Sequence, residues 1–391
     1  MATIRFDRVW KRYGPVEAVR DLNLTCADGE MLALLGPSGC GKTSTLKMVA
    51  GIEEVSEGEI LFDERPVSQL APAERNIAMV FEDYALYPHL SVFENIAFPL
   101  RIRRLPGAEL ERRVASAIAL LGLESLRDES VRRLSGGAQQ RVSIGRALVR
   151  DPELILFDEP LSHLDGDQKV QLRAEIKRLQ QTAGLTAILV THDQTEAIAM
   201  SDRVAVMNDG VLQQCDAPQQ LYDHPQNLFV ADFIGEPPMN LIPVTLREAN
   251  GAMFADGGGW HMALDRDAAG RLRRIATSDC VILGFRPEHV ELIEPGASCQ
   301  DADTLAGRVA WTEMRGDSHV VTLVPIESET DSSAMSGEEQ VTIEIRGVSA
   351  PNAGEPIAIR VRHDLLNLFN PHTGRNLLTI SSEGRGPGGP R

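Results

Sequence analysis

The sequence predicts two domains, an α/β domain with a mostly parallel sheet and an added antiparallel β layer, followed by a smaller all-β domain. The length of 391 residues exceeds what one hydrophobic core usually serves. Up to about residue 235, apolar runs alternate with amphipathic helical segments, and beyond it short segments of alternating hydrophobicity take over. The predicted limits are therefore 1–235 and 236–381, with a disordered Gly- and Pro-rich tail at 382–391.

The composition, with 43% hydrophobic and 24% charged residues, is typical of a soluble globular protein. A net charge of −17 argues against nucleic acid as a partner, because phosphate binding needs a basic surface. No apolar stretch approaches the ~18 residues that span a bilayer, and the N-terminus lacks a secretory apolar segment, so we expect a cytoplasmic protein. The cysteines are scattered without Cys-x2-Cys spacing and predict neither a disulfide framework nor a zinc site.

The first segment, residues 3–26, alternates apolar and polar residues and predicts an antiparallel β layer. Within it Tyr13 precedes Gly14-Pro15, which places an aromatic ring in an exposed loop. Such a ring is a candidate for stacking on a nucleotide base, although loop aromatics are more often simply packed.

The stretch Gly36-Pro37-Ser38-Gly39-Cys40-Gly41-Lys42-Thr43 fits the phosphate-binding pattern Gly-x4-Gly-Lys-[Ser/Thr]. A predicted strand at 31–35 precedes it and a predicted helix at 44–50 follows it, which is the context that the pattern needs. Glycines let backbone N–H groups surround an anion at the helix N-terminus, Lys42 would reach the β- and γ-phosphates, and the Thr43 hydroxyl would ligate Mg²⁺. The predicted binding residues are Ser38, Gly39, Cys40, Gly41, Lys42, Thr43 and Ser44.

Two further strands are predicted at 58–62 and 77–81, the second ending at the carboxylate pair Glu82-Asp83. Open α/β sheets place their ligands at such strand ends, but without other evidence a solvated turn is the favoured interpretation of the pair. From about 84 to 150 the pattern becomes helical, with Val114, Ile118 and Leu121 on one apolar face.

Ser135-Gly136-Gly137 stands at the start of a predicted helix, where free N–H groups and a hydroxyl form a second potential anion site. An ordinary helix N-cap is the alternative interpretation.

A buried strand at 154–157 leads to Asp158-Glu159, where a carboxylate beside the phosphate loop would hold Mg²⁺ and the next one would polarise the attacking water. After a turn at 162–165, an amphipathic helix is predicted to face inward through Val170, Leu172, Ile176 and Leu179. The next strand, 187–191, ends at His192. A lone His is usually structural, but at this sheet edge it is a candidate γ-phosphate contact or water-orienting group.

Residues 235–238 read as a linker, and strands at 281–285, 320–324 and 341–345 predict a small β-barrel or sandwich. Residues 326–340 form a predicted Ser- and Glu-rich loop.

These motifs, in this order and spacing, resemble the ATP-binding cassette family over essentially the whole chain. Segments 84–90, 190–194, 233–235 and 284–289 look like the ATPase subunit of carbohydrate importers of the maltose/glycerol-phosphate type. The resemblance implies a RecA-like P-loop NTPase core with a helical subdomain at about 84–150, and a transport-associated, OB-type regulatory domain. It also implies a head-to-tail homodimer that holds two ATP molecules, two transmembrane permease subunits and, indirectly, an extracytoplasmic substrate-binding protein.

By the same resemblance, Lys42 and Thr43 of one chain bind ATP while Ser135, Gly136 and Gly137 of the other close on its γ-phosphate. The resemblance further implies that Tyr13 stacks on adenine, Asp158 organises Mg²⁺, Glu159 is the general base and His192 is the switch histidine.

Three residues depart from the family pattern. Glu82 stands where the family has a Gln that contacts Mg²⁺ and the lytic water, which makes it a catalytic and metal candidate. Ala138 replaces the Gln of the Leu-Ser-Gly-Gly-Gln signature, and His163 stands where Asn or Ala is usual. Glu82 is the most consequential, since a like charge ~4 Å from another is worth up to about 4 kcal/mol at an effective dielectric near 20.

The expected function is that of an ATPase subunit of a sugar importer, peripheral on the inner face of the cell membrane. Two alternatives stay open on the sequence, an importer for another solute such as polyamine, sulfate or iron, and a weakly catalytic ATP-binding regulatory subunit. The departures favour the second alternative, and the intact Lys42, Asp158, Glu159 and His192 disfavour it.

Overall fold

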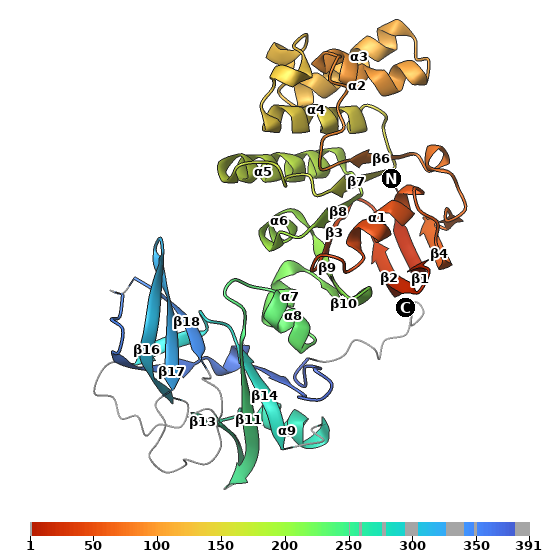
Figure 1. Cartoon of the computed structure of the whole chain (residues 1–391). Coiled ribbons are helices and arrows are strands. Elements are labelled where there is room, and N and C mark those ends of the chain that lie inside the picture. The colour runs from red at the N-terminus through yellow and green to blue at the C-terminus, as the bar shows by residue number, and fades with distance from the viewer. Residues whose placement is uncertain are drawn as a thin grey trace, which may run out of the picture. The chain divides into compact units, whose positions relative to one another are not determined.

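The structure, a computed structural model, describes residues 2–249, 251–257, 260–275, 279–293, 304–325, 340–347 and 350–379. By its internal packing the chain forms two compact units, Met1–Pro218 and Gln219–Arg391, shown as ribbons in Figure 1. The domain limits at 235 and 381 stay predictions. Among the described residues, no helix combines the length and apolar character that crossing a membrane requires.

The first unit begins with an antiparallel sheet in the order β2-β1-β4-β5. Its strands are β1 (Ile4–Tyr13), β2 (Val16–Cys26), β4 (Glu57–Phe62) and β5 (Arg65–Pro66). Along β1 the buried Ile4 and Phe6 flank the exposed Arg5, so the alternation in the sequence places one face in the core. The predicted antiparallel layer is confirmed.

A six-stranded sheet in the order β10-β9-β3-β8-β7-β6 forms the centre of this unit. Its strands are β3 (Met31–Leu35), β6 (Ile77–Val80), β7 (Leu154–Asp158), β8 (Ala187–Thr191), β9 (Arg203–Asn208) and β10 (Val211–Asp216). Neighbouring strands are parallel except for the β9–β10 hairpin. Every residue of β3 and β8 is buried, and apart from Thr191 at the end of β8 both sequences are unbroken apolar runs.

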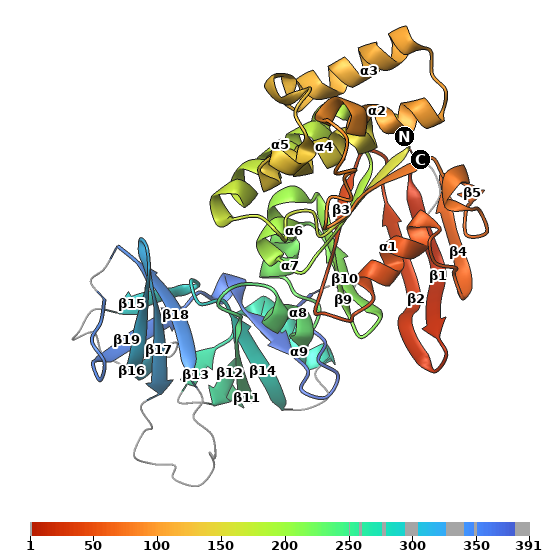
Figure 2. The ribbon, with the colours of Figure 1, turned by 45° about the horizontal axis from the view of Figure 1, so that its top comes forward.

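The helices of the first unit are α1 (Lys42–Ala50), α2 (Val92–Ile102), α3 (Gly107–Leu120), α4 (Gly136–Leu148), α5 (Gly166–Ala183) and α6 (Gln194–Met200). Helices α2, α3 and α4 gather at one end of the unit and pack on one another (Figures 1 and 2). Val114, Ile118 and Leu121 are buried there, as predicted. On α5, Leu172, Ile176 and Leu179 are buried, but the inward placement of Val170 is wrong, since it is 58% exposed. Val170 lies two residues before Leu172, where the 3.6-residue period turns its side chain to the opposite side of the helix.

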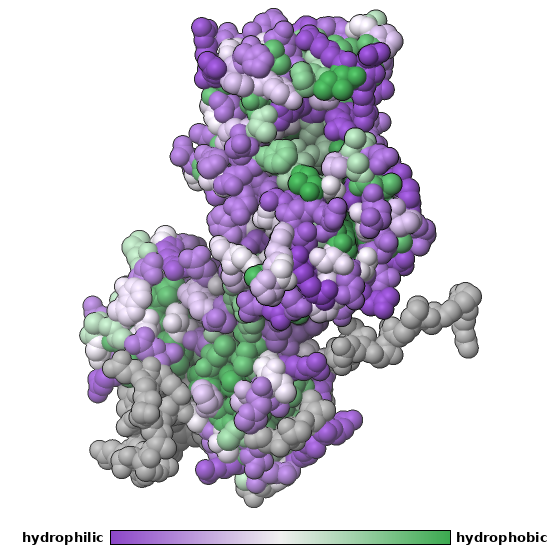
Figure 3. Space-filling view, turned by 45° about the vertical axis from the view of Figure 1, so that its right-hand side comes forward, coloured by the Kyte–Doolittle hydropathy of each residue, from purple (hydrophilic) through white to green (hydrophobic). Residues whose placement is uncertain are grey.

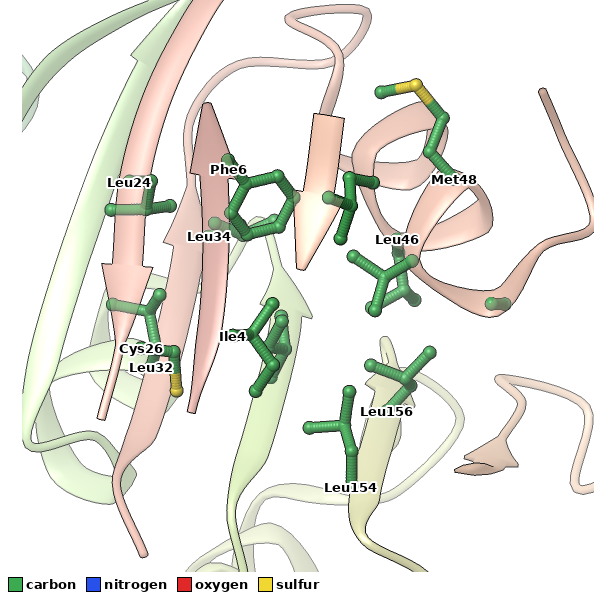
Figure 4. Close-up of a cluster of buried hydrophobic side chains, with 14 of the residues drawn as sticks. Ile4, Phe6, Leu24, Cys26, Leu32, Leu34, Leu46, Met48, Leu154 and Leu156 are labelled. Carbon is green, nitrogen blue, oxygen red and sulfur yellow. The ribbon is translucent and has the colours of Figure 1, made fainter. Parts of the chain in front are cut away.

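The main core of the first unit lies between the two sheets and α1. Ile4 and Phe6 of β1 meet Leu34 of β3, Leu46 of α1 and Leu156 of β7 in one cluster (Figure 4). Burying each such side chain stabilises the fold by roughly 1.5–3 kcal/mol. The cluster therefore fixes β3 and α1, the two elements that flank the phosphate-binding loop, against the antiparallel layer. In the view of Figure 3 the surface of this unit is mostly hydrophilic, with small apolar areas.

Arg75 ties the C-terminal end of α1 to the following segment. It is 1% exposed, and its guanidinium donates to the carbonyls of Met48, Val49, Ser68 and Leu70 at 2.6–3.1 Å. Met48 and Val49 lie in the last turn of α1, whose carbonyls receive no N–H from a following turn, although the Met48 carbonyl also accepts the N–H of the C-cap Gly51 at 3.2 Å. Arg75 thus caps the helix that carries the phosphate-binding loop.

We expect Arg75→Lys to lower the free energy of unfolding of the first unit by about 1–2 kcal/mol, since an ammonium cannot reproduce the planar fork and leaves carbonyls unpaired. Urea denaturation would measure the change. Arg65→Lys is the matched control, because Arg65 is half exposed in a surface ion pair with Glu153. Equal stability of both variants would contradict this role for Arg75.

The second unit contains two antiparallel five-stranded sheets, ordered β13-β12-β11-β14-β20 and β15-β19-β16-β17-β18. The strands of the first are β11 (Asn240–Ala249), β12 (Ala252–Gly257), β13 (Trp260–Ala263), β14 (Cys280–Phe285) and β20 (Asn367–Phe369). Those of the second are β15 (Val290–Ile293), β16 (Thr304–Arg315), β17 (Ser318–Pro325), β18 (Val341–Arg346) and β19 (Pro356–Val361). One apolar core joins both sheets, which confirms the all-β prediction. The predicted loop 326–340, except its last residue, and the tail 382–391 lie outside the described residues.

Helices α7 (Pro218–Asp223), α8 (Leu228–Phe233) and α9 (Arg266–Ile275) complete the structure and were not predicted. Arg286, which is completely buried after β14, explains why α7 and α8 pack with the second unit. Its guanidinium donates to the carbonyls of Tyr222, Ala231 and Ile234. The sequence pattern gives no signal for the packing of α7 and α8 around Arg286, because all three acceptors are backbone atoms.

Candidate functional site

The phosphate-binding loop joins β3 to α1, as predicted. Gly41 is the N-cap of α1 with a φ of 101°, and a Cβ there would stand 2.3 Å from the carbonyl oxygen of Ala18. The position therefore needs glycine for both its conformation and its space. Ser38 and Gly39 are exposed at the loop tip, and Thr43 is exposed in the first turn of α1.

Lys42 lies folded over this loop. It is 6% exposed, and its Nζ donates to the carbonyls of Gly36 at 2.7 Å and Pro37 at 3.0 Å, with Cys40 Sγ at 3.7 Å. The ammonium is thus held on the phosphate-binding loop by the dipoles of two of its carbonyl groups. Burial raises the pKa of the Cys40 thiol, and the nearby Lys42 opposes that rise.

Because burial keeps Cys40 protonated, we expect its alkylation by iodoacetamide to be at least several-fold slower than that of the exposed Cys280 at pH 7.5, and to accelerate as pH rises. ATP should slow it further, since the nucleotide would cover the loop. Peptide mass spectrometry over a time course measures both rates. Labelling of Cys40 at the rate of Cys280, unaffected by ATP, would refute the predicted protection.

The ends of β7 and β8 bring together the predicted catalytic pair. Glu159 follows β7 with a φ of 46°, and its N–H donates to Val190 O of β8 at 2.9 Å. Its Oε2 lies 2.9 Å from Nδ1 of His192, which follows β8. The Glu159 side chain is 25% exposed and that of His192 is 59% exposed, so the pair is open to a solvent molecule and to a substrate.

Asp158, the last residue of β7, lies in a strongly negative environment. Burial raises the pKa of its carboxyl, Glu159 and Glu82 raise it further, and Lys47 of α1 lowers it. A nearby cation would relieve this repulsion. Thr43 supplies a hydroxyl oxygen in the first turn of α1, so the donors are the oxygen ligands that Mg²⁺ prefers.

The part of the chain that the structure describes holds no group of three or more His, Cys, Asp or Glu residues arranged for a metal ion. Mg²⁺ is usually bound through one or two carboxylates together with phosphates rather than by an all-protein cage. The donor set around Asp158 therefore fits Mg²⁺ bound together with a phosphate-containing ligand.

Two of the departures from the family pattern meet in space. Glu82, two residues after β6, has its Oε1 3.6 Å from Nε2 of His163 in the turn before α5, and both side chains are about half exposed. The third, Ala138, is buried in the first turn of α4. There its N–H donates to the hydroxyl of Ser135 at 3.4 Å.

Ser135 is the N-cap of α4, with Gly136 and Gly137 in its first turn. No hydrogen bond joins these three residues to the phosphate-binding loop among the residues described in either segment. A Cβ added at Gly136 would meet Leu164 and Tyr84, and one at Gly137 would meet Gln168, none of which belongs to the phosphate-binding loop. Within one chain, these neighbours set the two predicted anion sites apart. Further along α4, Ser143 and Arg146 donate to the carbonyl of Tyr84, which links this helix to the loop that carries Glu82.

Tyr13 ends β1 and is 43% exposed, and its hydroxyl bonds to Ser44 of α1 and to Glu53. Glu53 was not predicted from the sequence, and neither was Lys47, which forms an ion pair with Glu53 and lowers the pKa of Asp158. Lys47 follows Thr43 by four residues, and that helical spacing is the signal that points to the site. Glu53 carries no comparable signal.

Two known families match parts of the chain. Residues 19–162 match the family described as ABC transporter, and residues 235–290 match the MalK OB fold domain. Among solved structures, cbiO1 from Clostridium perfringens, described as part of the ABC transporter complex cbiONQ, is similar at a TM-score of 0.53. It is 29% identical in sequence and covers 56% of this chain and 89% of its own.

Curated relatives extend the similarity across the chain. The trehalose/maltose import ATP-binding protein MalK of Thermococcus litoralis is 49% identical over 74% of this chain and 78% of its own length. The sn-glycerol-3-phosphate import ATP-binding protein UgpC of Chromohalobacter salexigens is 41% identical over 96% of this chain and 98% of its own. The diacetylchitobiose uptake system ATP-binding protein MsiK of Streptomyces coelicolor is 40% identical over 96% of this chain and 100% of its own.

Proposed function

The chain belongs to the ABC transporter family, as an ATP-binding subunit with a MalK OB-fold domain, and from this premise we propose how its site uses ATP. It is the ATPase subunit of an importer for a sugar or sugar derivative. The observation that carries the mechanism is the contact of Glu159 with His192 at the sheet edge that also holds Asp158 and the phosphate-binding loop.

In the proposed mechanism, the N–H groups of residues 38–44 and the ammonium of Lys42 bind the phosphates of ATP, and Tyr13 stacks on adenine. Glu159 accepts the proton of the attacking water, and His192 holds the Glu159 carboxylate in position through Nδ1. Asp158 and Thr43, with Glu82 beside them, would hold Mg²⁺. When bound, Mg²⁺ neutralises charge that develops on the phosphates.

The separation of Ser135, Gly136 and Gly137 from the loop supports a second proposal, that the site is completed by another copy of the chain. In a head-to-tail homodimer, these residues of one chain would close on the γ-phosphate bound by the other. Closure would then act on two transmembrane permease subunits through a surface that includes residues 84–90. This places the protein at the cytoplasmic face of the membrane, with a substrate-binding protein delivering cargo on the other side.

The test is purification of the tagged full chain from membranes, with identification of what accompanies it. We expect two integral membrane proteins in equal amounts, and ATP hydrolysis by the complex that a sugar-loaded binding protein stimulates. A chain that hydrolyses ATP but never retains membrane proteins would contradict the importer assignment. If a binding protein loaded with a solute other than a sugar stimulated hydrolysis, only the proposed cargo would have to be revised.

A further inference from the structure

We propose that Glu53 is a positioning residue that fixes the ring of Tyr13 for stacking on the nucleotide base. The inference rests on the proposed ATP site, and it adds a residue to which neither sequence motif nor family comparison assigns a role.

Glu53 lies just beyond α1 and is built into the structure rather than displayed on its surface. Its side chain is 20% exposed, and its N–H donates to the Lys47 carbonyl of α1 at 3.2 Å. The carboxylate accepts a hydrogen bond from the Tyr13 hydroxyl. It also forms ion pairs with Lys11 at 3.5 Å and Lys47 at 3.7 Å. One carboxylate thus joins the end of β1 to the helix that follows the phosphate-binding loop.

The ring of Tyr13 is constrained at its edge and on one face. Its hydroxyl lies between Glu53 and Ser44, with Ser44 Oγ at 3.3 Å. The ammonium of Lys11 stands 4.7 Å from the ring centroid and is itself held by the Glu54 carbonyl at 2.9 Å. Since Tyr13 is nevertheless 43% exposed, ring surface remains available for a planar ligand. The contacts fix the plane of the ring relative to the loop that would hold the phosphates.

A ring fixed in advance binds more tightly than a mobile one, because ordering a side chain on binding opposes association. We therefore expect loss of the Glu53 carboxylate to weaken ATP binding about three- to tenfold, because an amide accepts from Tyr13 more weakly and lacks the ion pairs with Lys11 and Lys47 that hold the acceptor in place. Lys47, the ion-pair partner of Glu53, also lowers the pKa of Asp158, so a change at Glu53 could alter the charge at the phosphate end of the site. A phosphate ligand without a base separates an effect on the Tyr13 ring from an effect on the phosphate end of the site.

The experiment measures binding of ATP and of inorganic tripolyphosphate to the full chain by calorimetry. We expect Glu53→Gln and Tyr13→Phe each to weaken ATP binding three- to tenfold and to leave tripolyphosphate binding unchanged. Glu54→Gln is the matched control, since Glu54 is the exposed neighbouring carboxylate and should change neither. The double variant Tyr13→Ala with Glu53→Gln should bind ATP no more weakly than Tyr13→Ala alone.

Equal weakening of both ligands by Glu53→Gln, or additive losses in the double variant, would overturn the proposal, because Glu53 would then act on the loop or independently of Tyr13. If Tyr13→Ala weakens ATP binding while Glu53→Gln and Tyr13→Phe do not, the positioning role fails and base stacking stands. If Tyr13→Ala binds ATP like the unaltered chain, the stacking assignment of the proposed function fails instead, and the role of Glu53 falls with it.

Discussion

Replacing Glu159 by Gln is expected to lower the rate of Mg²⁺-dependent ATP hydrolysis about 10²–10⁴-fold, while ATP still binds. The amide cannot accept a proton from water, but it keeps the size of the carboxylate and can still bond to His192 at the 2.9 Å contact. The backbone of Glu159, with its positive φ, is unaffected by the change. Phosphate release under saturating ATP measures the rate, and ATP binding by calorimetry measures the retained affinity.

Glu124→Gln is the matched control, because Glu124 is an exposed carboxylate in the connection between α3 and α4. It should hydrolyse ATP at the rate of the unaltered chain. If Glu159→Gln retained that rate as well, the general base would have to be another group, and Glu82 would be the next carboxylate to test. Loss of hydrolysis together with loss of ATP binding would indicate a damaged site rather than a missing base.

The sequence predicted those parts of the fold and site that depend on local pattern. Asp158 could be placed because a carboxylate follows an unbroken apolar run, and such runs are buried parallel strands. Lys42 could be placed because a strand and a helix flank its loop. Three of the C-terminal strands, β14, β17 and β18, followed from alternation alone.

The missed features depend on contacts between segments distant in the chain. Glu53 acquires its neighbours only when α1 packs beside the end of β1, and Arg286 bonds to backbone atoms that carry no sequence signal. Val170 was misplaced because it was assigned from its apolar character, although it lies two residues before Leu172 and therefore on the opposite side of the helix. Ser135 was found by its motif. Its position relative to the phosphate-binding loop cannot be predicted from one chain, if two chains together build the site.

Glu82→Gln is expected to raise the affinity for ATP without Mg²⁺ about ten- to a hundredfold, with a smaller gain when Mg²⁺ is present. A carboxylate near Asp158 and Glu159 repels the phosphates unless a cation offsets it, and such like-charge terms reach about 4 kcal/mol at ~4 Å. The expected gain in ATP affinity stays below this upper value because the Glu82 side chain is 49% exposed and His163 lies 3.6 Å from it. The ratio of ATP affinities with and without Mg²⁺ should therefore shrink.

Glu82→Gln is also expected to change how the rate of ATP hydrolysis depends on pH. Burial, Glu159 and Glu82 raise the pKa of Asp158, so its carboxylate, which would hold Mg²⁺, is lost on acidification at a higher pH than an ordinary aspartate. Without the Glu82 charge that pKa falls, and the acid limb of the hydrolysis profile should move to lower pH. His163→Asn, which removes the partner of Glu82, should move it the other way, and Asp83→Asn is the neighbouring control. An unchanged Mg²⁺ dependence and acid limb in Glu82→Gln would show that solvent screens this carboxylate from the site.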